Sequence, residues 1–180
     1  YDGSHHSISS LPGMLERTVI LDGFSKTYAM TGWRLGYGVM PPALQAHISR
    51  LVTNSVSCTA PFTQIAGLEA LANAESDVLE MVAEFRRRRD FISKALDSIP
   101  GIRCLCPPGA FYVFPNIQSF GMKSSAFADY LLNSAGVAVL SGSSFGEFGE
   151  GHIRISYANS MVNLAKAVQR IGEAVGKLGR

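Results

Sequence analysis

The sequence predicts an α/β protein built in two lobes, and three observations support this prediction. Short apolar runs alternate with amphipathic helical segments over residues 1–72. A long amphipathic stretch with apolar residues at helical spacing follows over residues 73–98. Beyond it, short apolar runs separated by Pro and Gly accompany two further helical segments over residues 99–180. We therefore expect a first lobe, a linking helix and a compact α+β second lobe.

Turn signals and apolar runs place the elements of the first lobe. Residues 18–21 form a β-branched apolar run and predict a buried strand. The later part of 32–39 predicts a second strand, in which glycines permit close approach of another backbone segment. Helices are predicted over 41–56 and 61–73, because each segment opens on proline, which suits the first helical turn. The linking helix is predicted over 76–98.

Four strands and two helices are predicted in the second lobe. The helix over 124–135 ends at a glycine, which is typical of a helix C-terminus. The helix over 160–178 begins at Ser160, a favourable N-cap residue. The predicted strands cover residues 102–106, 110–114, 137–140 and 152–157.

The composition is that of an ordinary globular protein and narrows the classes of function. The 180 residues are 47% hydrophobic and 17% charged, which excludes a disordered or coiled-coil chain. The formal net charge of +2 is too small to indicate nucleic acid or an anionic membrane as partner. No apolar run approaches the roughly 20 residues of a membrane span, and the first residues do not read as a signal peptide. Three cysteines make no disulfide framework, so we expect a soluble cytoplasmic protein.

A lysine and an arginine in the segment 23–36 carry the strongest chemical signal. Lys26 follows the first predicted strand among small residues, and Arg34 lies eight positions later in a glycine-rich stretch. Partial burial and a neighbouring cation would both lower the pKa of Lys26, and Schiff-base chemistry requires a neutral amine. The permanently charged guanidinium of Arg34 suits a phosphate dianion. The pair fits pyridoxal 5′-phosphate, although a surface lysine and a structural arginine explain the same residues.

The whole segment resembles the cofactor-lysine signature of the class I and II aminotransferases of fold type I. Besides Lys26 and Arg34, the matching positions are Gly23, Ser25, Ala29, Met30, Gly32 and Gly36. The resemblance implies that Lys26 forms the Schiff base with pyridoxal 5′-phosphate and that Arg34 binds its phosphate. Ser25 is a further candidate hydroxyl donor to the cofactor. Some family members carry a serine where this chain has Gly23, so only a backbone N–H is present there.

Two later stretches resemble the same family. Residues 109–115 resemble its small-domain strand motif, and residues 141–146 with 151–158 resemble its C-terminal substrate segment. The resemblance implies that Arg154 binds the substrate α-carboxylate. Independently, an arginine on an apolar strand needs a counter-anion, and an internal carboxylate is the alternative partner. The family fold implied is the C-terminal part of the large domain, with a partial, mainly parallel sheet (1–72), plus an α+β small domain.

The resemblance implies transfer of an amino group between an α-amino acid and a 2-keto acid, with Lys26 as acid and base. Family members are much longer, and this chain matches their C-terminal half. Their aspartate for the pyridine nitrogen lies upstream, and neither Asp2 nor Asp22 matches it. We therefore expect the isolated chain to be inactive. We also expect it to form a homodimer or otherwise self-associate through exposed apolar faces.

The sequence also leaves other functions and other sites open. A lyase of the same fold could share Lys26 and Arg34, and a truncated chain could act as a non-catalytic dimerising or regulatory module. The run 86–89 of four arginines predicts a solvated or salt-bridging helix face. Cys104 and Cys106 lack a second ligand pair, so no metal site is expected. In the family, the loop that contains Thr59 reaches the partner subunit's active site, which makes Thr59 a weak candidate contact.

Overall fold

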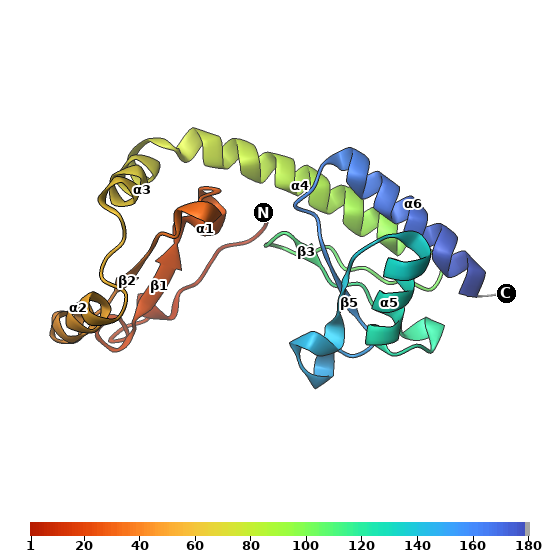
Figure 1. Cartoon of the computed structure of the whole chain (residues 1–180), viewed down its shortest axis with the longest axis horizontal. Coiled ribbons are helices and arrows are strands. Elements are labelled where there is room, and N and C mark those ends of the chain that lie inside the picture. Colours follow the sequence, from red (N-terminus) through yellow and green to blue (C-terminus); the bar gives the residue numbers. More distant parts are fainter. Residues whose placement is uncertain (179–180) are drawn as a thin grey trace. The chain divides into compact units, whose positions relative to one another are not determined.

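A computed structural model describes residues 1–178 of the chain. Its contacts divide it into two compact units. The N-terminal unit is Gly3–Met81, and the C-terminal unit is Tyr1–Asp2 together with the chain from Val82 onward. The long helix α4 (Glu75–Asp97) begins in the first unit and ends in the second (Figure 1). None of the helices in the described range combines the length and apolar character that a membrane crossing requires.

The predicted helices are confirmed to within one residue at each end. The N-terminal unit contains α2 (Pro42–Ser55) and α3 (Pro61–Asn73), each with proline in its first turn. The C-terminal unit contains α5 (Ser124–Ala135) and α6 (Met161–Leu178). The hydroxyl of Ser160 accepts a hydrogen bond from the Asn163 backbone N–H at 3.2 Å, which is the contact expected of an N-cap residue.

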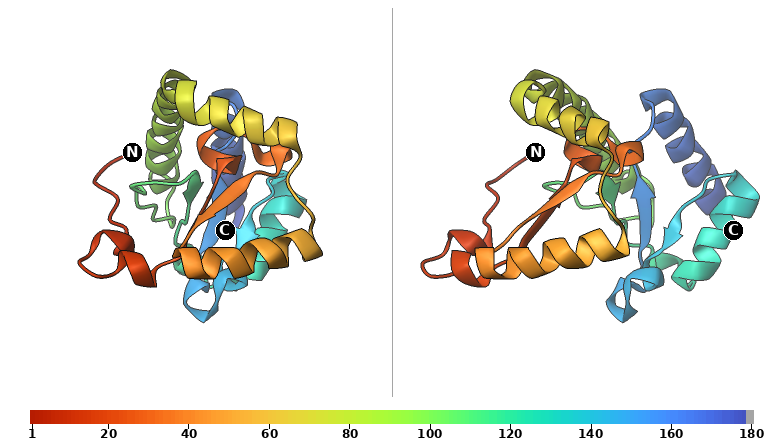
Figure 2. Two further views of the ribbon diagram at one scale, coloured as in Figure 1. Left: turned by 90° about the vertical axis from the view of Figure 1, so that its left-hand side faces the viewer. Right: turned by 60° about the vertical axis from the view of Figure 1, so that its left-hand side comes forward.

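The N-terminal unit is built on a two-stranded ribbon. Strand β1 (Ile20–Gly23) pairs antiparallel with β2 (Gly36–Val39), so that Ile20 faces Val39 and Gly23 faces Gly36. The connection holds the short helix α1 (Phe24–Thr27) and the 3₁₀ turn η3 (Thr31–Trp33), and two further 3₁₀ turns precede β1: η1 (Ile8–Ser10) and η2 (Leu15–Arg17). Figure 2 shows the ribbon with α2 and α3 in the same unit.

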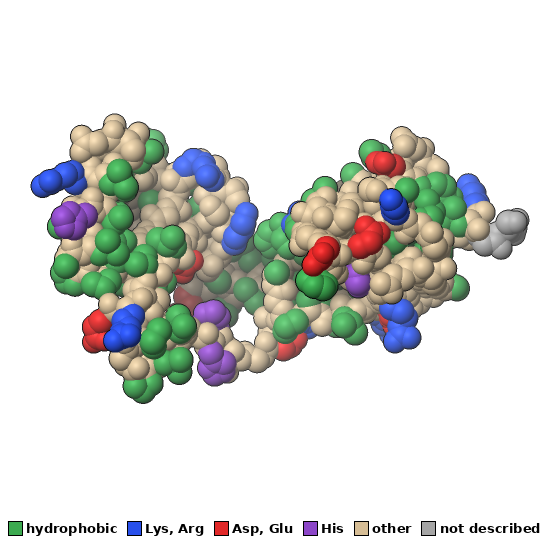
Figure 3. All heavy atoms as spheres, turned by 90° about the horizontal axis from the view of Figure 1, so that it is seen from below, with side chains coloured by type: hydrophobic (Ala, Val, Ile, Leu, Met, Phe, Trp, Pro, Cys, Tyr) green, Lys and Arg blue, Asp and Glu red, His purple; other side chains and the backbone are tan. Residues whose placement is uncertain are grey.

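Two expectations for this unit are corrected. The ribbon is antiparallel, because the connection turns back at the strand end instead of crossing over, so the mainly parallel pairing expected for this lobe is absent from the described residues. The strand predicted to be buried is open, with Leu21 78% exposed and every residue of β2 exposed. Apolar side chains also lie exposed on α3, and Figure 3 shows hydrophobic side chains scattered over the surface of this unit.

The C-terminal unit contains a small antiparallel sheet in the order β3-β5-β4. Its strands are β3 (Tyr112–Val113), β4 (Leu140–Ser141) and β5 (Ile153–Ser156), and three 3₁₀ turns accompany them: η4 (Gln118–Phe120), η5 (Gly142–Phe145) and η6 (Glu147–Gly149). The strands are shorter than the sequence predicts. The segment 102–106 contributes only an isolated bridge between Arg103 and Asn116, and the segment 137–140 joins the sheet only at its last residue.

The core of the molecule lies in the C-terminal unit. Side chains from α4, α5, α6 and the inner face of the sheet form it, among them Ile92, Leu96, Val113, Phe127, Leu131, Ile153, Ile155 and Ile171. Ile153 and Ile155 face this core, and Arg154 between them lies on the other face of β5, because side chains alternate along a strand. The α/β fold with a compact second lobe is therefore confirmed.

One arginine of the run 86–89 is buried, so of the two predicted alternatives the salt-bridging face holds there and the solvated face does not. Arg89 is 5% exposed and binds the carboxylates of Asp2 and Asp90 and the carbonyl oxygen of Pro107. Its guanidinium also lies 4.8 Å from the ring centroid of Tyr1. A buried guanidinium needs counter-charges, and the carboxylates of Asp2 and Asp90 supply them. Arg87 and Arg88 pair with Glu84 on the helix surface, as a salt-bridging face predicts.

Candidate active site

The register of the ribbon brings Lys26 and Arg34 into one loop. Gly23 and Gly36 are opposite each other at the end of the ribbon, and the Phe24 N–H donates to the Leu35 carbonyl oxygen at 3.2 Å. The segment between these residues, which carries both cations, therefore closes on itself. Helix α3 lies against it at Gly67, where an added Cβ would come within 2.4 Å of the Leu35 side chain. A glycine in α3 thus permits the close packing that holds this loop.

Arg34 has the backbone and the donor groups of a ligand-binding residue. Its backbone is left-handed, with φ 55°, and Ala29 on the other side of η3 is also left-handed, with φ 52°. Such conformations cost non-glycine residues about 1–3 kcal/mol and cluster at functional sites. One guanidinium nitrogen donates to the Thr31 carbonyl oxygen at 2.9 Å. Within residues 1–178 the guanidinium forms no ion pair, so its charge is available to an anion.

Lys26 and Ser25 lie on the single turn of α1. Phe24 points into the unit and is buried, Ser25 is half-buried, and Lys26 is exposed. The partial burial of Lys26 expected from its small neighbours is therefore wrong for this chain. The reason is geometric: the one apolar face of this short helix is taken by Phe24, which directs the lysine outward.

An open pocket of about 800 Å³ lies beside Arg34. The segment that follows α2 contributes Cys58 and Thr59 to it, and α3 contributes the buried Thr63. Among residues 1–178, no carboxylate side chain lines this pocket. Arg34, Thr59 and Thr63, which line the pocket, carry a guanidinium and two hydroxyls, and donors of these kinds suit a phosphate group, so the residues present fit the phosphate end of the cofactor. Thr59, which the sequence analysis gives as a weak candidate contact, lines the pocket, whereas Lys26 does not.

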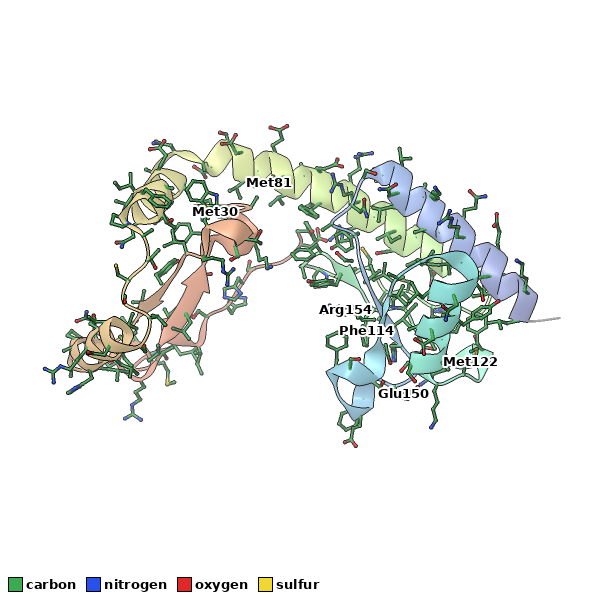
Figure 4. All side chains as sticks on the ribbon, viewed as in Figure 1. Met30, Met81, Phe114, Met122, Glu150 and Arg154 are labelled. Carbon is green, nitrogen blue, oxygen red and sulfur yellow. The ribbon has the colours of Figure 1, made fainter. Side chains whose placement is uncertain are left out.

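Arg154 lies on the outer face of the small sheet, in the C-terminal unit. Its guanidinium carbon is 4.3 Å from the ring centroid of Tyr112 and 4.5 Å from that of Phe145. Figure 4 labels Arg154 and Phe114 on this unit. Across residues 1–178 no carboxylate lies within ion-pair distance of Arg154. The alternative that an internal carboxylate neutralises this arginine is therefore wrong for the described chain.

The two aromatic residues that contact Arg154, Tyr112 and Phe145, are not among the site residues predicted from the sequence. Alternation along the predicted strand places Tyr112 on the same face as Phe114, but the pairing of β3 with β5, which brings that face to Arg154, could not be read from the sequence. The place of Phe145 could not be read from the sequence either, because Phe145 follows β4 in a 3₁₀ turn whose direction depends on packing.

Cys104, for which the sequence predicts no metal-binding role, is buried, and this burial raises the pKa of its thiol to about 12. No group of His, Cys, Asp and Glu in the described part of the chain could hold a metal ion.

Comparison with known proteins places these residues in a family. The sequence profile of "Aminotransferase class I and II" matches residues 3–171. The chain is 46% identical over 162 residues to an aspartate aminotransferase of Pyrococcus horikoshii, covering 89% of this chain and 41% of that protein. It is 42% identical over 174 residues to aromatic-amino-acid aminotransferase 2 of Thermococcus litoralis, covering 95% of this chain and 44% of that protein.

Solved structures agree with the sequence comparison. An aromatic aminotransferase from Pyrococcus horikoshii superimposes with a TM-score of 0.94 at 40% identity, covering 98% of this chain and 48% of that one. The chain thus spans less than half the length of the relatives it matches. Over that span both sequence and backbone correspond, and the chain belongs to the class I and II aminotransferase family.

Proposed function

We propose that the chain serves a pyridoxal 5′-phosphate-dependent aminotransferase, which transfers an amino group between an α-amino acid and a 2-keto acid. The observation that carries the proposal is the closed loop at the end of the ribbon, which holds Lys26 together with Arg34. Among residues 1–178 the Arg34 guanidinium forms no ion pair. Relatives named as aspartate and aromatic-amino-acid aminotransferases support the reaction class. They do not agree on the substrate, so the proposal stops at α-amino acids.

The proposed roles follow from the chemistry of each side chain. The amine of Lys26 would hold the cofactor at its aldehyde carbon, with water as the leaving group, and when not so engaged would move the proton at the substrate Cα, a transfer typically worth 10²–10⁴-fold in rate. Arg34 binds the cofactor phosphate, and the Ser25 hydroxyl donates a hydrogen bond to the cofactor. Arg154 binds the substrate α-carboxylate through two parallel N–H groups. When bound, the cofactor ring supplies the electron sink that makes the Cα proton acidic.

The same proposal includes the domain assignment and the state of the chain. Residues 1–72 are proposed as the C-terminal portion of a large cofactor-binding domain, 73–98 as the linking helix, and 99–180 as the small domain. The exposed apolar residues of the N-terminal unit favour self-association, with a homodimer as the simplest form. Because the chain spans less than half of its relatives, we propose that it is inactive by itself. A cytoplasmic location belongs to the same proposal.

The test is selective labelling of Lys26. The purified chain is incubated with pyridoxal 5′-phosphate, its visible spectrum is recorded before and after borohydride, and the reduced adduct is located by mass spectrometry. The proposal predicts an adduct at Lys26 that is absent from Lys26→Ala and unchanged in Lys94→Ala, an exposed lysine on α4. An adduct spread equally over the lysines, or none, in this chain and also in a longer protein containing it would overturn the proposed role of Lys26.

A further inference from the structure

The outer face of the small sheet carries one cation among apolar side chains. Tyr112 faces Ser156 and Leu140 faces Arg154 across the sheet, so all four side chains lie opposite the core-facing Ile153 and Ile155. Exposed aromatic residues extend this face, with Phe114 40% and Phe145 48% exposed. Arg154 forms no ion pair within residues 1–178, so the aromatic rings around it are its observed partners.

Two rings do hold it, from different elements. Arg154 lies over the Tyr112 ring from β3 and over the Phe145 ring from η5, at 4.3 and 4.5 Å from the respective centroids. A guanidinium against an aromatic face is stabilised by about 0.5–1 kcal/mol at exposed sites. This attraction does not neutralise the charge and uses no N–H donor of the guanidinium. The contact therefore fixes the position of Arg154 while leaving its donors for a ligand.

The Phe145 ring is itself supported. Phe114 meets it edge-on at 6.1 Å and stacks on the His152 ring at 5.1 Å. The chain before Phe145 is fixed by two hydroxyl–hydroxyl hydrogen bonds of 2.7 Å, one between Ser141 and Ser124 and one between Ser141 and Ser143. The second ring is thus held by packing on one side and by its own loop on the other.

We propose that Tyr112 and Phe145 form a ring clamp, which holds the guanidinium of Arg154 so that its N–H edge meets a planar carboxylate. They are positioning residues, because they act on the ligand through Arg154. That the carboxylate belongs to an amino acid substrate rests on the proposed function, whereas the clamp itself rests on the ring geometry. The exposed rings beside the arginine favour a carboxylate joined to an apolar group, and 3-phenylpropanoate is a suitable probe.

The test uses the 180-residue chain and nuclear magnetic resonance of the arginine Nε–Hε groups. In the wild-type chain the Arg154 signal, identified by its loss in Arg154→Lys, is expected upfield of the other arginines because two rings shield it. Titration with 3-phenylpropanoate is expected to shift this signal, and 3-phenylpropanamide to leave it in place. In Phe145→Leu the Arg154 signal is expected to move downfield, since only the Tyr112 ring still shields it, and the Kd is expected to rise roughly threefold from the loss of one cation–π contact.

Phe148→Leu is the matched control, since Phe148 lies on the same loop, is 92% exposed and contacts no ring of the clamp. It should change neither the signal nor the Kd. The rest of the spectrum shows that Phe145→Leu is folded. An Arg154 signal and a Kd that are the same in Phe145→Leu and wild type would overturn the clamp, as would the lack of any response to 3-phenylpropanoate. Failure of the Lys26 labelling alone would leave this result standing, so the two proposals fail separately.

Discussion

The carboxylate of Glu150 accepts two hydrogen bonds from Ser124, one from the backbone N–H at 2.7 Å and one from the hydroxyl at 2.8 Å. Ser124 is the first residue of α5 and is fully buried. A residue between η6 and β5 therefore caps a distant helix, and an acidic group stands where the positive end of the helix dipole favours it. The contact ties the start of α5 to the loop that carries Phe145.

The first prediction concerns the pH dependence of this cap. The backbone and side-chain hydrogen bonds from Ser124 lower the pKa of Glu150. A lowered folded-state pKa means that the charged carboxylate stabilises the fold above its unfolded pKa of about 4.3, and that this contribution is lost as the pH falls through the folded value. Glu150→Gln should therefore unfold at lower urea concentration than wild type at pH 7, and the difference should shrink towards pH 3. Glu147→Gln, at an exposed position on the same loop, is the control variant.

A second prediction separates the buried arginine of α4 from its exposed neighbour. Arg89→Met removes charged hydrogen bonds to Asp2, Asp90 and the Pro107 carbonyl, and should lower the free energy of unfolding by about 2 kcal/mol. Arg87→Met removes only an exposed pair with Glu84 and should change it little. Chemical denaturation monitored by circular dichroism compares the two. Equal effects would show that Asp2 does not anchor the chain start to α4.

The third prediction compares two helical glycines. In Gly67→Ala the new Cβ would meet the Leu35 side chain at 2.4 Å and the Phe24 ring at 3.4 Å, and overpacking of this kind costs about 1–3 kcal/mol. Gly176 in α6 has nothing within 4 Å of its added Cβ, so Gly176→Ala should stabilise the chain by up to about 1 kcal/mol. Thermal unfolding measures both. A neutral Gly67→Ala would mean that α3 does not hold the Lys26 loop closely.

The fourth prediction addresses the phosphate preference of Arg34. Arg34→Lys keeps the charge and loses the planar donor pair that matches phosphate oxygens. The wild-type chain should therefore react with pyridoxal 5′-phosphate at lower concentration than with pyridoxal, and the variant should narrow that difference by roughly tenfold, as expected for a loss of about 1.4 kcal/mol. Absorbance titrations of both aldehydes measure it. Arg50→Lys, on α2, is the control, and an equal effect there would remove the special role of Arg34.

Local sequence signals were sufficient to predict the helices and the family of the chain. Proline at helix starts, glycine after α5 and the serine before α6 are local signals, because capping and backbone restriction act within one turn. The signature around Lys26 and Arg34 is likewise local. A local motif of this kind is therefore sufficient to predict the family from the sequence.

Burial and side-chain contacts, by contrast, depend on how distant segments of the chain pack together. Leu21 lies open although its segment is apolar, since the two-stranded ribbon leaves it uncovered. Arg89 is buried within a charged run because residues at the chain start fold over it. Phe145 meets Arg154 across a turn whose direction no periodicity encodes. Burial and ring contacts depend on groups distant in sequence, and chain position alone does not specify the distance between them.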